Sequence, residues 1–317
     1  MVRLVEVERK SDVLKHPSLP CLSKYHTINL TAGCPYECRY CYAQSFRSYP
    51  GLGTVKFYVN TLRRLTCELA RKRKKPELVY FSTACEPFIP YRRILGQLYQ
   101  VMELLLGNSV FLLVSTKSRI PEDFLQLFHR YCGQIHVQVG LTTADDWVRR
   151  ALEPKAAAVQ ERLATLLALV ELGIPSEARM DPLIPELTDT EESFVSLCAE
   201  LAQRGARNAV ASYLFIRRSN LRRLRISFGN WSFHEMAKRL YTDRIREYCG
   251  GGTVRIVASA YRQAKYRQFR RIAADHGITL ALCGCKNPDV TDECCHPQPP
   301  RTINNTQLPL FEQSQHE

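Results

Sequence analysis

One loop, residues 27–45 with the sequence TINLTAGCPYECRYCYAQS, constrains this chain more than any other segment. It places Cys34, Cys38 and Cys41 in the spacing C-x3-C-x2-C after a strand-like run. Three thiolates on one loop can ligate three irons of a [4Fe–4S] cluster and leave the fourth iron without a protein ligand. A structural zinc site is the alternative, since zinc takes cysteines at similar spacings. Zinc sites usually pair two such loops, and no second cysteine pair is near in the sequence, so the spacing favours the cluster.

Strand-like and helix-like segments alternate between residues 26 and 215. Six apolar runs predict strands, namely HTINL, ELVYFS, SVFLLVST, QIHVQVGLTT, IPSEARMDPLIP and ARNAVASYLF. Between them, apolar residues recur at helical spacing over residues 57–74, 94–106, 122–131, 156–172 and 191–203. This alternation predicts an α/β fold with a parallel sheet. Six such units suit a barrel of the TIM type, in which the active site lies at the carboxyl ends of the strands.

The remaining segments divide by composition. Residues 1–25 form a polar leader, residues 26–215 the barrel, and residues 216–296 a basic C-terminal α/β extension that ends in a cysteine-rich segment. In this extension we expect helices at residues 233–248 and 261–276, and strands at residues 253–258 and at ITLALC. Residues 297–317 are rich in Pro, Asn and Gln, which predicts a disordered tail.

The charge of the chain points to a polyanionic partner. The formal net charge is +13, from 44 basic and 31 acidic residues, and part of the excess lies in the run RRSNLRRLR. Lys and Arg that neutralise phosphates supply most non-specific affinity for nucleic acid. We therefore predict phosphate contacts, preferably to DNA, by Arg217, Arg218, Arg222, Arg223 and Arg225. The alternative is a solvated helix surface, which is our interpretation of the other basic run, RKRKK at residues 71–75.

The sequence predicts a cytoplasmic protein with no membrane partner. No apolar run reaches the roughly 18 residues that span a bilayer, and the N-terminus lacks the apolar core of a signal peptide. Clustered cysteines in such a chain more often bind metal or do redox work than form disulfides. The single cysteines are expected to be small buried hydrophobes. They are Cys21, Cys67, Cys132, Cys198 and Cys249.

A second group of cysteines, in the segment CGCKNPDVTDECCHP, has the spacing C-x-C-x8-C-C. Its members are Cys283, Cys285, Cys294 and Cys295, followed by His296. Four thiolates suffice for a closed site, either tetrahedral zinc or an auxiliary iron–sulfur cluster. Adjacent cysteines rarely ligate one metal with relaxed geometry, so His296 could replace either Cys294 or Cys295.

The cysteine loop, with Tyr40 just before its last cysteine, resembles the signature of radical S-adenosylmethionine (SAM) enzymes. The later segments FSTACEPFIP, LVSTKS, ALEPKAAAVQERLATLLALVELGIP and DPLIP follow in the order of the spore photoproduct lyase-like members, over about residues 25–187 and more loosely at the terminal cysteines. The resemblance implies that the six units form a partial (β/α)6 barrel of the TIM type. It further implies a [4Fe–4S] cluster whose open iron chelates SAM, with an electron cleaving SAM to a 5′-deoxyadenosyl radical. It also implies an electron donor such as flavodoxin or ferredoxin.

The same resemblance implies roles for single residues. Tyr42 would flank the substrate side of the cluster. The residues implied to contact SAM are Tyr40, Glu86, Ser115, Lys117, Thr142, Thr143 and Arg179. Lys117 suits the SAM carboxylate because its ammonium is compact and has three donors. The alternatives are that Arg179 pairs with Glu153, and that the threonines cap a helix at TADDW.

Cys85 is the candidate hydrogen-atom donor. In the lyase a cysteine near the second strand returns a hydrogen atom to the repaired base, and Cys85 lies about two residues from that family position. A thiol suits this role because its S–H bond is weak. The alternative is a buried, inert cysteine.

These observations favour a radical SAM enzyme that acts on nucleic acid, in DNA lesion repair or base modification. One alternative is a radical SAM maturase that modifies a protein or peptide and uses the terminal cysteines to hold it. Another is an iron–sulfur binding module without enzymatic activity.

The tail contains the short motif QLPLF in an otherwise polar segment. Gln307, Leu308, Leu310 and Phe311 resemble the peptide by which bacterial repair and replication proteins bind the sliding clamp. The apolar side chains would fill a groove, and Pro309 would lower the entropy lost on ordering. The alternative is that the motif folds back onto the protein.

Overall fold

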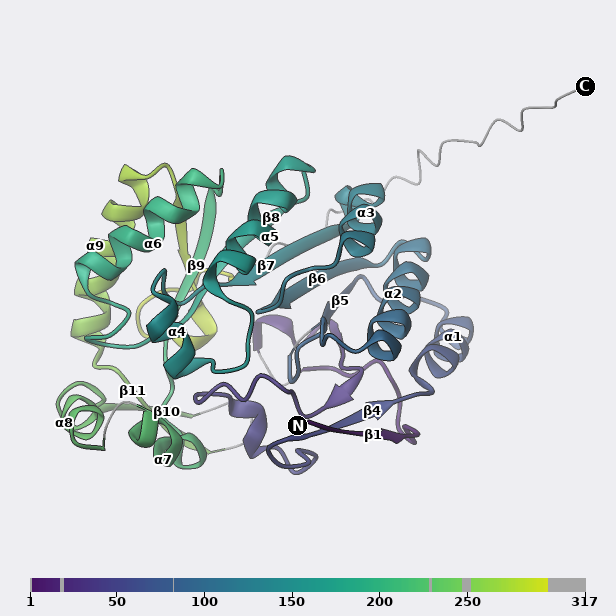
Figure 1. Cartoon of the computed structure of the whole chain (residues 1–317), viewed down its shortest axis with the longest axis horizontal. Coiled ribbons are helices and arrows are strands. Elements are labelled where there is room, and N and C mark those ends of the chain that lie inside the picture. The colour runs from purple at the N-terminus through teal and green to yellow at the C-terminus, as the bar shows by residue number, and fades with distance from the viewer. Residues whose placement is uncertain (1, 18–19, 82, 228–229, 247–251, 296–317) are drawn as a thin grey trace, which may run out of the picture.

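The computed structural model describes residues 2–17, 20–81, 83–227, 230–246 and 252–295. Within these residues, seven strands form one sheet in the order β12-β9-β8-β7-β6-β5-β2, and all neighbouring pairs are parallel (Figure 1). The strands are β2 (His26–Ile28), β5 (Leu78–Phe81), β6 (Phe111–Thr116), β7 (Ile135–Gly140), β8 (Ser176–Leu183), β9 (Asn208–Tyr213) and β12 (Thr279–Leu282). The edge strands β2 and β12 do not pair, so the sheet is a partial barrel.

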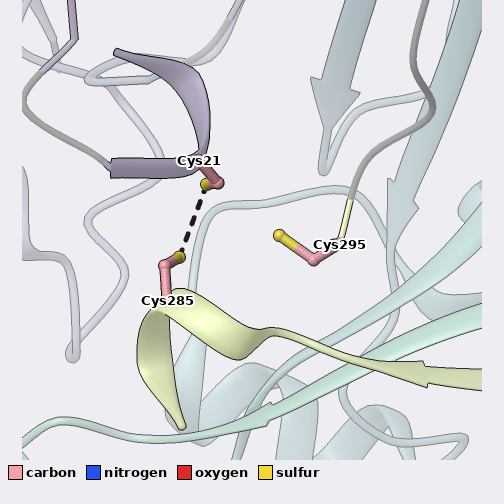
Figure 2. A group of neighbouring side chains, drawn as sticks. All are labelled: Cys21, Cys285 and Cys295. Atoms are coloured by element: carbon pink, nitrogen blue, oxygen red, sulfur yellow. Dashed lines mark hydrogen bonds between the residues drawn. The ribbon is translucent and has the colours of Figure 1, made fainter. Parts of the chain in front are cut away.

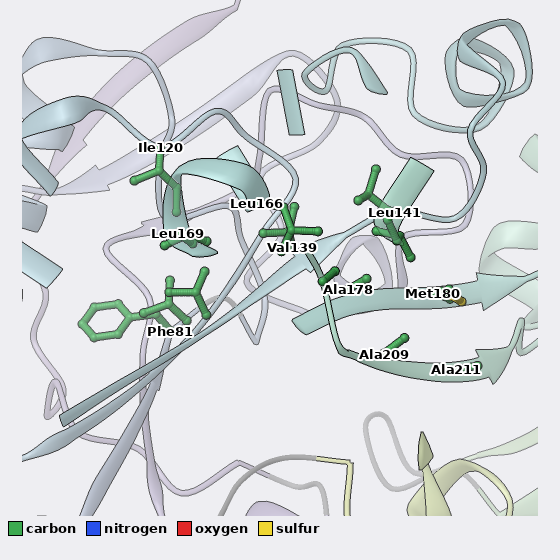
Figure 3. Close-up of a cluster of buried hydrophobic side chains, with 14 of the residues drawn as sticks. Phe81, Ile120, Val139, Leu141, Leu166, Leu169, Ala178, Met180, Ala209 and Ala211 are labelled. Atoms are coloured by element: carbon green, nitrogen blue, oxygen red, sulfur yellow. The ribbon is translucent and has the colours of Figure 1, made fainter. Parts of the chain in front are cut away.

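Helices connect successive strands and cover one face of the sheet. They are α1 (Thr61–Arg71), α2 (Arg92–Gly107), α3 (Glu122–Arg130), α4 (Asp146–Leu152), α5 (Val159–Glu171), α6 (Glu191–Gln203) and α9 (Ser259–Asp275). Alternate strand residues such as Phe81 and Val139 belong to the same buried cluster as Leu166 and Leu169 of α5 (Figure 3). Burial of each such side chain stabilises the fold by about 1.5–3 kcal/mol.

The other face of the same strands is more polar. Because side chains alternate along a strand, Tyr80, Ser115, Gln138 and Arg179 point away from the helices. The Ser115 and Tyr80 hydroxyls lie 2.7 Å apart, and Ser115 donates to Gln138 Oε1 at 2.7 Å. This hydrogen-bonded face forms the floor of the site described below.

Two smaller sheets flank the barrel. In the first, β4 (Thr54–Tyr58) pairs with β1 (Arg3–Val7) in parallel and with β3 (Thr31–Ala32) antiparallel. In the second, β10 (Asp243–Arg246) and β11 (Thr253–Ile256) form an antiparallel pair. This pair lies with α7 (Arg218–Ser227) and α8 (Asn230–Leu240) at the lower left of Figure 1. Short 3-10 helices are η1 (Pro20–Leu22), η2 (Tyr42–Ser45), η3 (Cys132–Gln134) and η4 (Gly284–Lys286).

The α/β partial barrel predicted from the sequence is confirmed, and three details differ. The strand predicted at ITLALC joins the barrel sheet as β12, beside β9. The first helix begins at Thr61 because residues 54–58 pair as β4. The helix expected at residues 233–248 ends at Leu240, because Asp243–Arg246 pairs with β11 instead. In the last two cases strand pairing overrides the local helical pattern.

In the described part of the chain, no helix combines the length and apolar character needed to cross a bilayer.

Candidate active site

A cavity of about 240 Å³ opens at the carboxyl ends of the barrel strands, and all three loop cysteines line it. Its wall also includes β5 and the residues after it, the ends of β6 and β7, the later part of β8, and the segments after β9 and β12. Cys34, Cys38 and Cys41, which are 7 residues apart from first to last, are therefore brought to one place, as the spacing predicted.

The cysteine loop takes its shape from local geometry. Gly33 has a φ of +84°, and a Cβ there would lie 2.4 Å from the Thr54 carbonyl oxygen and 2.7 Å from Pro50 Cγ. Only glycine fits this position, which directly precedes Cys34. The turn then closes with the Cys41 amide donating to the Cys38 carbonyl at 3.1 Å. The loop shaped in this way lines the cavity with its three cysteines.

Burial raises the pKa of all three cysteine thiols. Their thiolates would need positive charge, which a metal cluster supplies when its irons are ligated. The donor set fits a [4Fe–4S] cluster, because three thiols from one loop share a cavity with room beside them.

Tyr40 is held by a buried ion pair. Its hydroxyl donates to Glu153, and Glu153 Oε2 lies 2.5 Å from Arg162 Nη2. The two charged side chains are 0% and 1% exposed. Burial alone would raise the pKa of Glu153, but Arg162 and then Lys117 bring it below its ordinary value. The pairing of Arg179 with Glu153, considered as an alternative above, is wrong, since Arg162 holds that carboxylate.

Lys117 supplies a cation to the cavity. Its ammonium lies 5.8 Å from the centre of the Tyr40 ring, and a Cβ on Gly140 would lie 2.9 Å from Lys117 Cγ. Gly140 therefore leaves room for this side chain. Within the described ranges the ammonium has no ion-pair partner within 4.0 Å, so it is available to an anionic group.

Glu86 positions the strand end that carries Lys117. Its carboxylate accepts from Thr116 Oγ1 at 2.6 Å, from the Lys117 amide at 2.9 Å and from the Phe88 amide at 3.2 Å. Burial raises the pKa of Glu86, which these hydrogen bonds partly offset. Glu86 also lines the cavity, so it joins the loop after β5 to the end of β6.

Arg179 belongs to a charged network that the sequence did not reveal. Its Nη2 lies 3.0 Å from Asp181 Oδ2, and Lys286 Nζ lies 2.5 Å from Asp181 Oδ1. Burial would raise the pKa of Asp181, but Lys286 and Arg179 hold it well below its ordinary value. Arg179 also donates to Gln138 Oε1 at 3.2 Å. Arg179 and Asp181 are two residues apart on β8, so their side chains lie on the same face of the sheet. This spacing is the sequence feature that could have predicted the pair.

Thr142 and Thr143 are both 2% exposed and do not belong to the cavity wall. Thr143 Oγ1 accepts from the Asp145 amide at 3.0 Å, and Asp145 caps α4 by accepting from the Trp147 amide at 2.7 Å. The N-cap of α4 is therefore Asp145, so the alternative that the threonines cap this helix is wrong.

Cys85 and Tyr42, the two residues predicted to take part in chemistry, both line the cavity. Cys85 is 8% exposed, and its Sγ lies 3.4 Å from Asn29 Oδ1. Burial raises the pKa of its thiol. The Tyr42 hydroxyl donates to the Thr83 carbonyl. Cys85 thus faces the same space as the cysteine loop.

The basic run RRSNLRRLR, residues 217–225, forms most of α7, and its first residue lies at the cavity. Arg217 lines the cavity, and its guanidinium lies 5.3 Å from the centre of the Tyr42 ring. Arg223 Nε donates at 3.4 Å to the carbonyl of Arg39, which lies in the cysteine loop between Cys38 and Cys41. Arg218 and Arg222 are exposed, and Arg225 is half-buried. The run therefore extends from the cavity to the surface.

The cysteines that lie together near the C-terminus are not the four that the sequence predicted. Cys283, Cys285 and Cys295 lie together, whereas Cys294 is exposed. The additional member is Cys21, whose Sγ lies 3.5 Å from Cys285 Sγ. The prediction that Cys21 is an isolated hydrophobe is wrong, because folding brings together residues 264 positions apart. His296 and the QLPLF motif lie outside the described residues.

Comparisons with known proteins agree with this geometry. The family model described as "Radical SAM superfamily" matches residues 28–198, more than half of the chain. An uncharacterized protein of Mycobacterium tuberculosis is 29% identical over 227 residues, covering 68% of this chain and 66% of the relative, just under two thirds of its length. The protein named radical SAM Nalpha-GlyT isomerase, from Pseudomonas phage M6, is 25% identical over 83% of this chain and 54% of its own.

Among solved structures, spore photoproduct lyase complexed with dinucleoside spore photoproduct superposes with a TM-score of 0.69. The match has 15% sequence identity and covers 88% of this chain and 81% of the lyase, so the fold is shared. The resemblance inferred from the sequence motifs is confirmed. The chain belongs to the radical SAM superfamily of enzymes.

Proposed function

We propose that this protein cleaves SAM reductively and directs the resulting radical to a nucleic acid, most consistently DNA. The observation that carries the proposal is that the three loop cysteines, Lys117 and Arg217 line one cavity. Cys34, Cys38 and Cys41 would hold a [4Fe–4S] cluster. When bound, the cluster and SAM supply a 5′-deoxyadenosyl radical that abstracts a hydrogen atom from the substrate.

The residues around the cysteine loop would bind and orient SAM. Lys117 would pair with the SAM carboxylate, since its ammonium reaches the cavity beside Tyr40. The Tyr40 ring, fixed through Glu153, would flank the adenine. Ser115 and Arg179 would also contact SAM, and the hydrogen bonds that both donate to Gln138 would hold their side chains in place. Glu86 would act mainly by holding the Lys117 backbone in place.

Cys85 would return a hydrogen atom to the substrate radical. The S–H bond would break homolytically, the new C–H bond would form on the substrate, and a sulfur radical would remain on Cys85. A second hydrogen atom, or an electron with a proton from the electron donor, would then reset the thiol. Burial keeps this thiol protonated, which the role requires.

The placement of α7 supports nucleic acid as the substrate. Arg217 lies at the cavity and Arg218 and Arg222 are exposed on the same helix, so a polyanion bound along α7 would lead into the cavity. The solved lyase of the same fold holds a dinucleoside, which is consistent with this substrate class. We further propose a cytoplasmic setting with flavodoxin or ferredoxin as electron donor.

Replacing Arg218 and Arg222 together by Gln should weaken binding to a duplex oligonucleotide. Each lost phosphate contact removes about 0.9 from the slope of log K against log salt, so the slope should fall by nearly two. Fluorescence anisotropy across a sodium chloride series measures it. The weakening should be similar for all sequences, because phosphate contacts carry no sequence information.

The matched control is the pair Arg267 and Arg271 on α9, which are exposed at the same spacing of four residues. Their replacement by Gln removes the same charge and should leave most of the slope unchanged. Equal effects of both double variants would show non-specific attraction to the net charge. Unchanged binding in the α7 variant would instead favour the alternative of a protein or peptide substrate.

We propose from the sequence that the tail binds a bacterial sliding clamp through QLPLF. A labelled peptide of residues 306–313 should bind purified clamp with a dissociation constant of tens of micromolar or tighter, on the order of the weak end of specific peptide recognition. Peptides with Leu310→Ala or Phe311→Ala should lose that binding, because these side chains would fill the apolar groove. Equal binding by the Ala peptides would remove this proposal.

A further inference from the structure

Four cysteine sulfurs lie close together on the polar side of the barrel, next to the radical cavity, whose wall includes Cys285. Cys283 Sγ lies 3.3 Å from Cys285 Sγ, and Cys285 Sγ lies 3.5 Å from Cys21 Sγ. Ligand atoms of Cys21, Cys285 and Cys295 all lie within 4.8 Å of one another (Figure 2). These distances are well beyond the roughly 2.05 Å of a disulfide bond.

The surroundings of these sulfurs suit a metal ion. Cys283 and Cys295 are 1% and 6% exposed, and both pack against Val210 of β9. The Arg179 guanidinium is close enough to interact electrostatically with both of these sulfurs. A cation nearby would offset the net negative charge that four thiolates leave around a divalent ion.

The spacing of the sulfurs distinguishes a single ion from a cluster. A tetrahedron with zinc–sulfur bonds of about 2.3 Å has sulfur–sulfur edges of about 3.8 Å. In a [4Fe–4S] cluster each cysteine sulfur binds a different iron, and in a [2Fe–2S] cluster only two share an iron. In neither do three cysteine sulfurs gather around one ion, as those of Cys21, Cys285 and Cys295 would. The 3.3 and 3.5 Å distances join Cys283 and Cys21 to Cys285, and Cys295 lies within 4.8 Å of Cys21 and Cys285. From this spacing we propose that Cys21, Cys283, Cys285 and Cys295 bind one tetrahedral Zn²⁺, with release of their thiol protons.

The proposed ion would join the two open edges of the barrel. Cys21 precedes the edge strand β2, whereas Cys283 and Cys285 follow the opposite edge strand, β12. The Cys295 carbonyl accepts from Gln138 Nε2 at 3.0 Å, which ties the end of this segment to β7. A bound ion would therefore connect the segments beside β2 and β12, the two edge strands, which do not pair with each other.

The ion would also stabilise one wall of the radical cavity. Cys285 and Lys286 both line that cavity, and Lys286 pairs with Asp181 at 2.5 Å. Loss of the ion should release this segment without removing a ligand of the cysteine loop. The site is thus structural, distinct from the proposed SAM site, and its test does not depend on SAM cleavage.

Metal analysis of the anaerobically purified full chain tests the assignment. We expect about one zinc per chain in addition to the iron. Cys21→Ala and Cys285→Ala should lose most of that zinc, while Cys294→Ala should keep it, because Cys294 is the exposed neighbour of Cys295. Zinc loss in Cys294→Ala with retention in Cys21→Ala would overturn the ligand set.

Cobalt substitution of the wild-type chain keeps the test independent of how well the variants fold. Co²⁺ added in place of zinc should give the intense visible bands of a tetrahedral thiolate site, and zinc should displace it. Wild-type protein without zinc and without these bands would refute the site. Iron beyond four per chain, lost in Cys285→Ala, would show a cluster and equally refute a single ion.

Discussion

Replacing Cys34, Cys38 or Cys41 singly by Ala should abolish SAM cleavage. Each cysteine would ligate one iron, and loss of one ligand leaves no cluster with a single open iron. Changes to groups that only support metal ligands already cost about 10–100-fold in affinity or activity, so loss of a ligand should cost more than 100-fold. The measurement is 5′-deoxyadenosine formed from SAM and a reductant under anaerobic conditions, together with iron content.

Matched controls exist elsewhere in the chain. Cys67 and Cys132 are exposed, and neither lines the cavity. Cys67→Ala and Cys132→Ala should form 5′-deoxyadenosine at the wild-type rate. Retained cleavage in any of the three loop variants would contradict the assignment of the cluster ligands.

Arg162→Met should be the most destabilising single change described here. It leaves the Glu153 carboxylate, which is 0% exposed, buried without its cation. Breaking a buried ion pair from one side costs about 3–5 kcal/mol. Urea unfolding at neutral pH measures it. The cost should shrink as the pH falls, because protonation neutralises the orphaned Glu153.

Two further variants separate this pair from ordinary surface charge. Glu153→Gln combined with Arg162→Met removes both charges, and it should recover much of the lost stability because no unpaired charge remains buried. Lys155→Met breaks the more exposed pair between Lys155 and Glu37, which should cost at most about 1 kcal/mol. A cost for Arg162→Met no larger than that for Lys155→Met would contradict the role given to the buried pair.

Local sequence signals predicted the parts of the molecule that are set by local geometry. The spacing of Cys34, Cys38 and Cys41 placed them together because they lie on one turn, which Gly33 permits. Six apolar runs separated by helical patterns predicted the parallel sheet, since the period of apolar residues follows directly from strand and helix geometry. The family resemblance implied roles for Lys117 and Cys85, and both reach the cavity because each follows a strand and strand ends meet at one edge of a parallel sheet.

Contacts between distant segments could not be predicted in the same way. Nothing near Cys21 indicates that it meets Cys285, because that contact depends on both edges of the sheet. Glu153 and Arg162 are separated by a turn and a helix start, and their burial depends on the packing around Tyr40. For β10 the pairing with β11 is local, but the helical pattern of the preceding residues led to a helix being predicted there.

The most direct test of the proposed function is anaerobic reconstitution with iron and sulfide, followed by SAM and dithionite, with and without DNA containing lesions. We predict about four irons per chain at the loop cysteines, 5′-deoxyadenosine as the product, and faster product formation with DNA than without it. A chain that binds the cluster yet forms no 5′-deoxyadenosine would contradict the proposal and would be an iron–sulfur binding module.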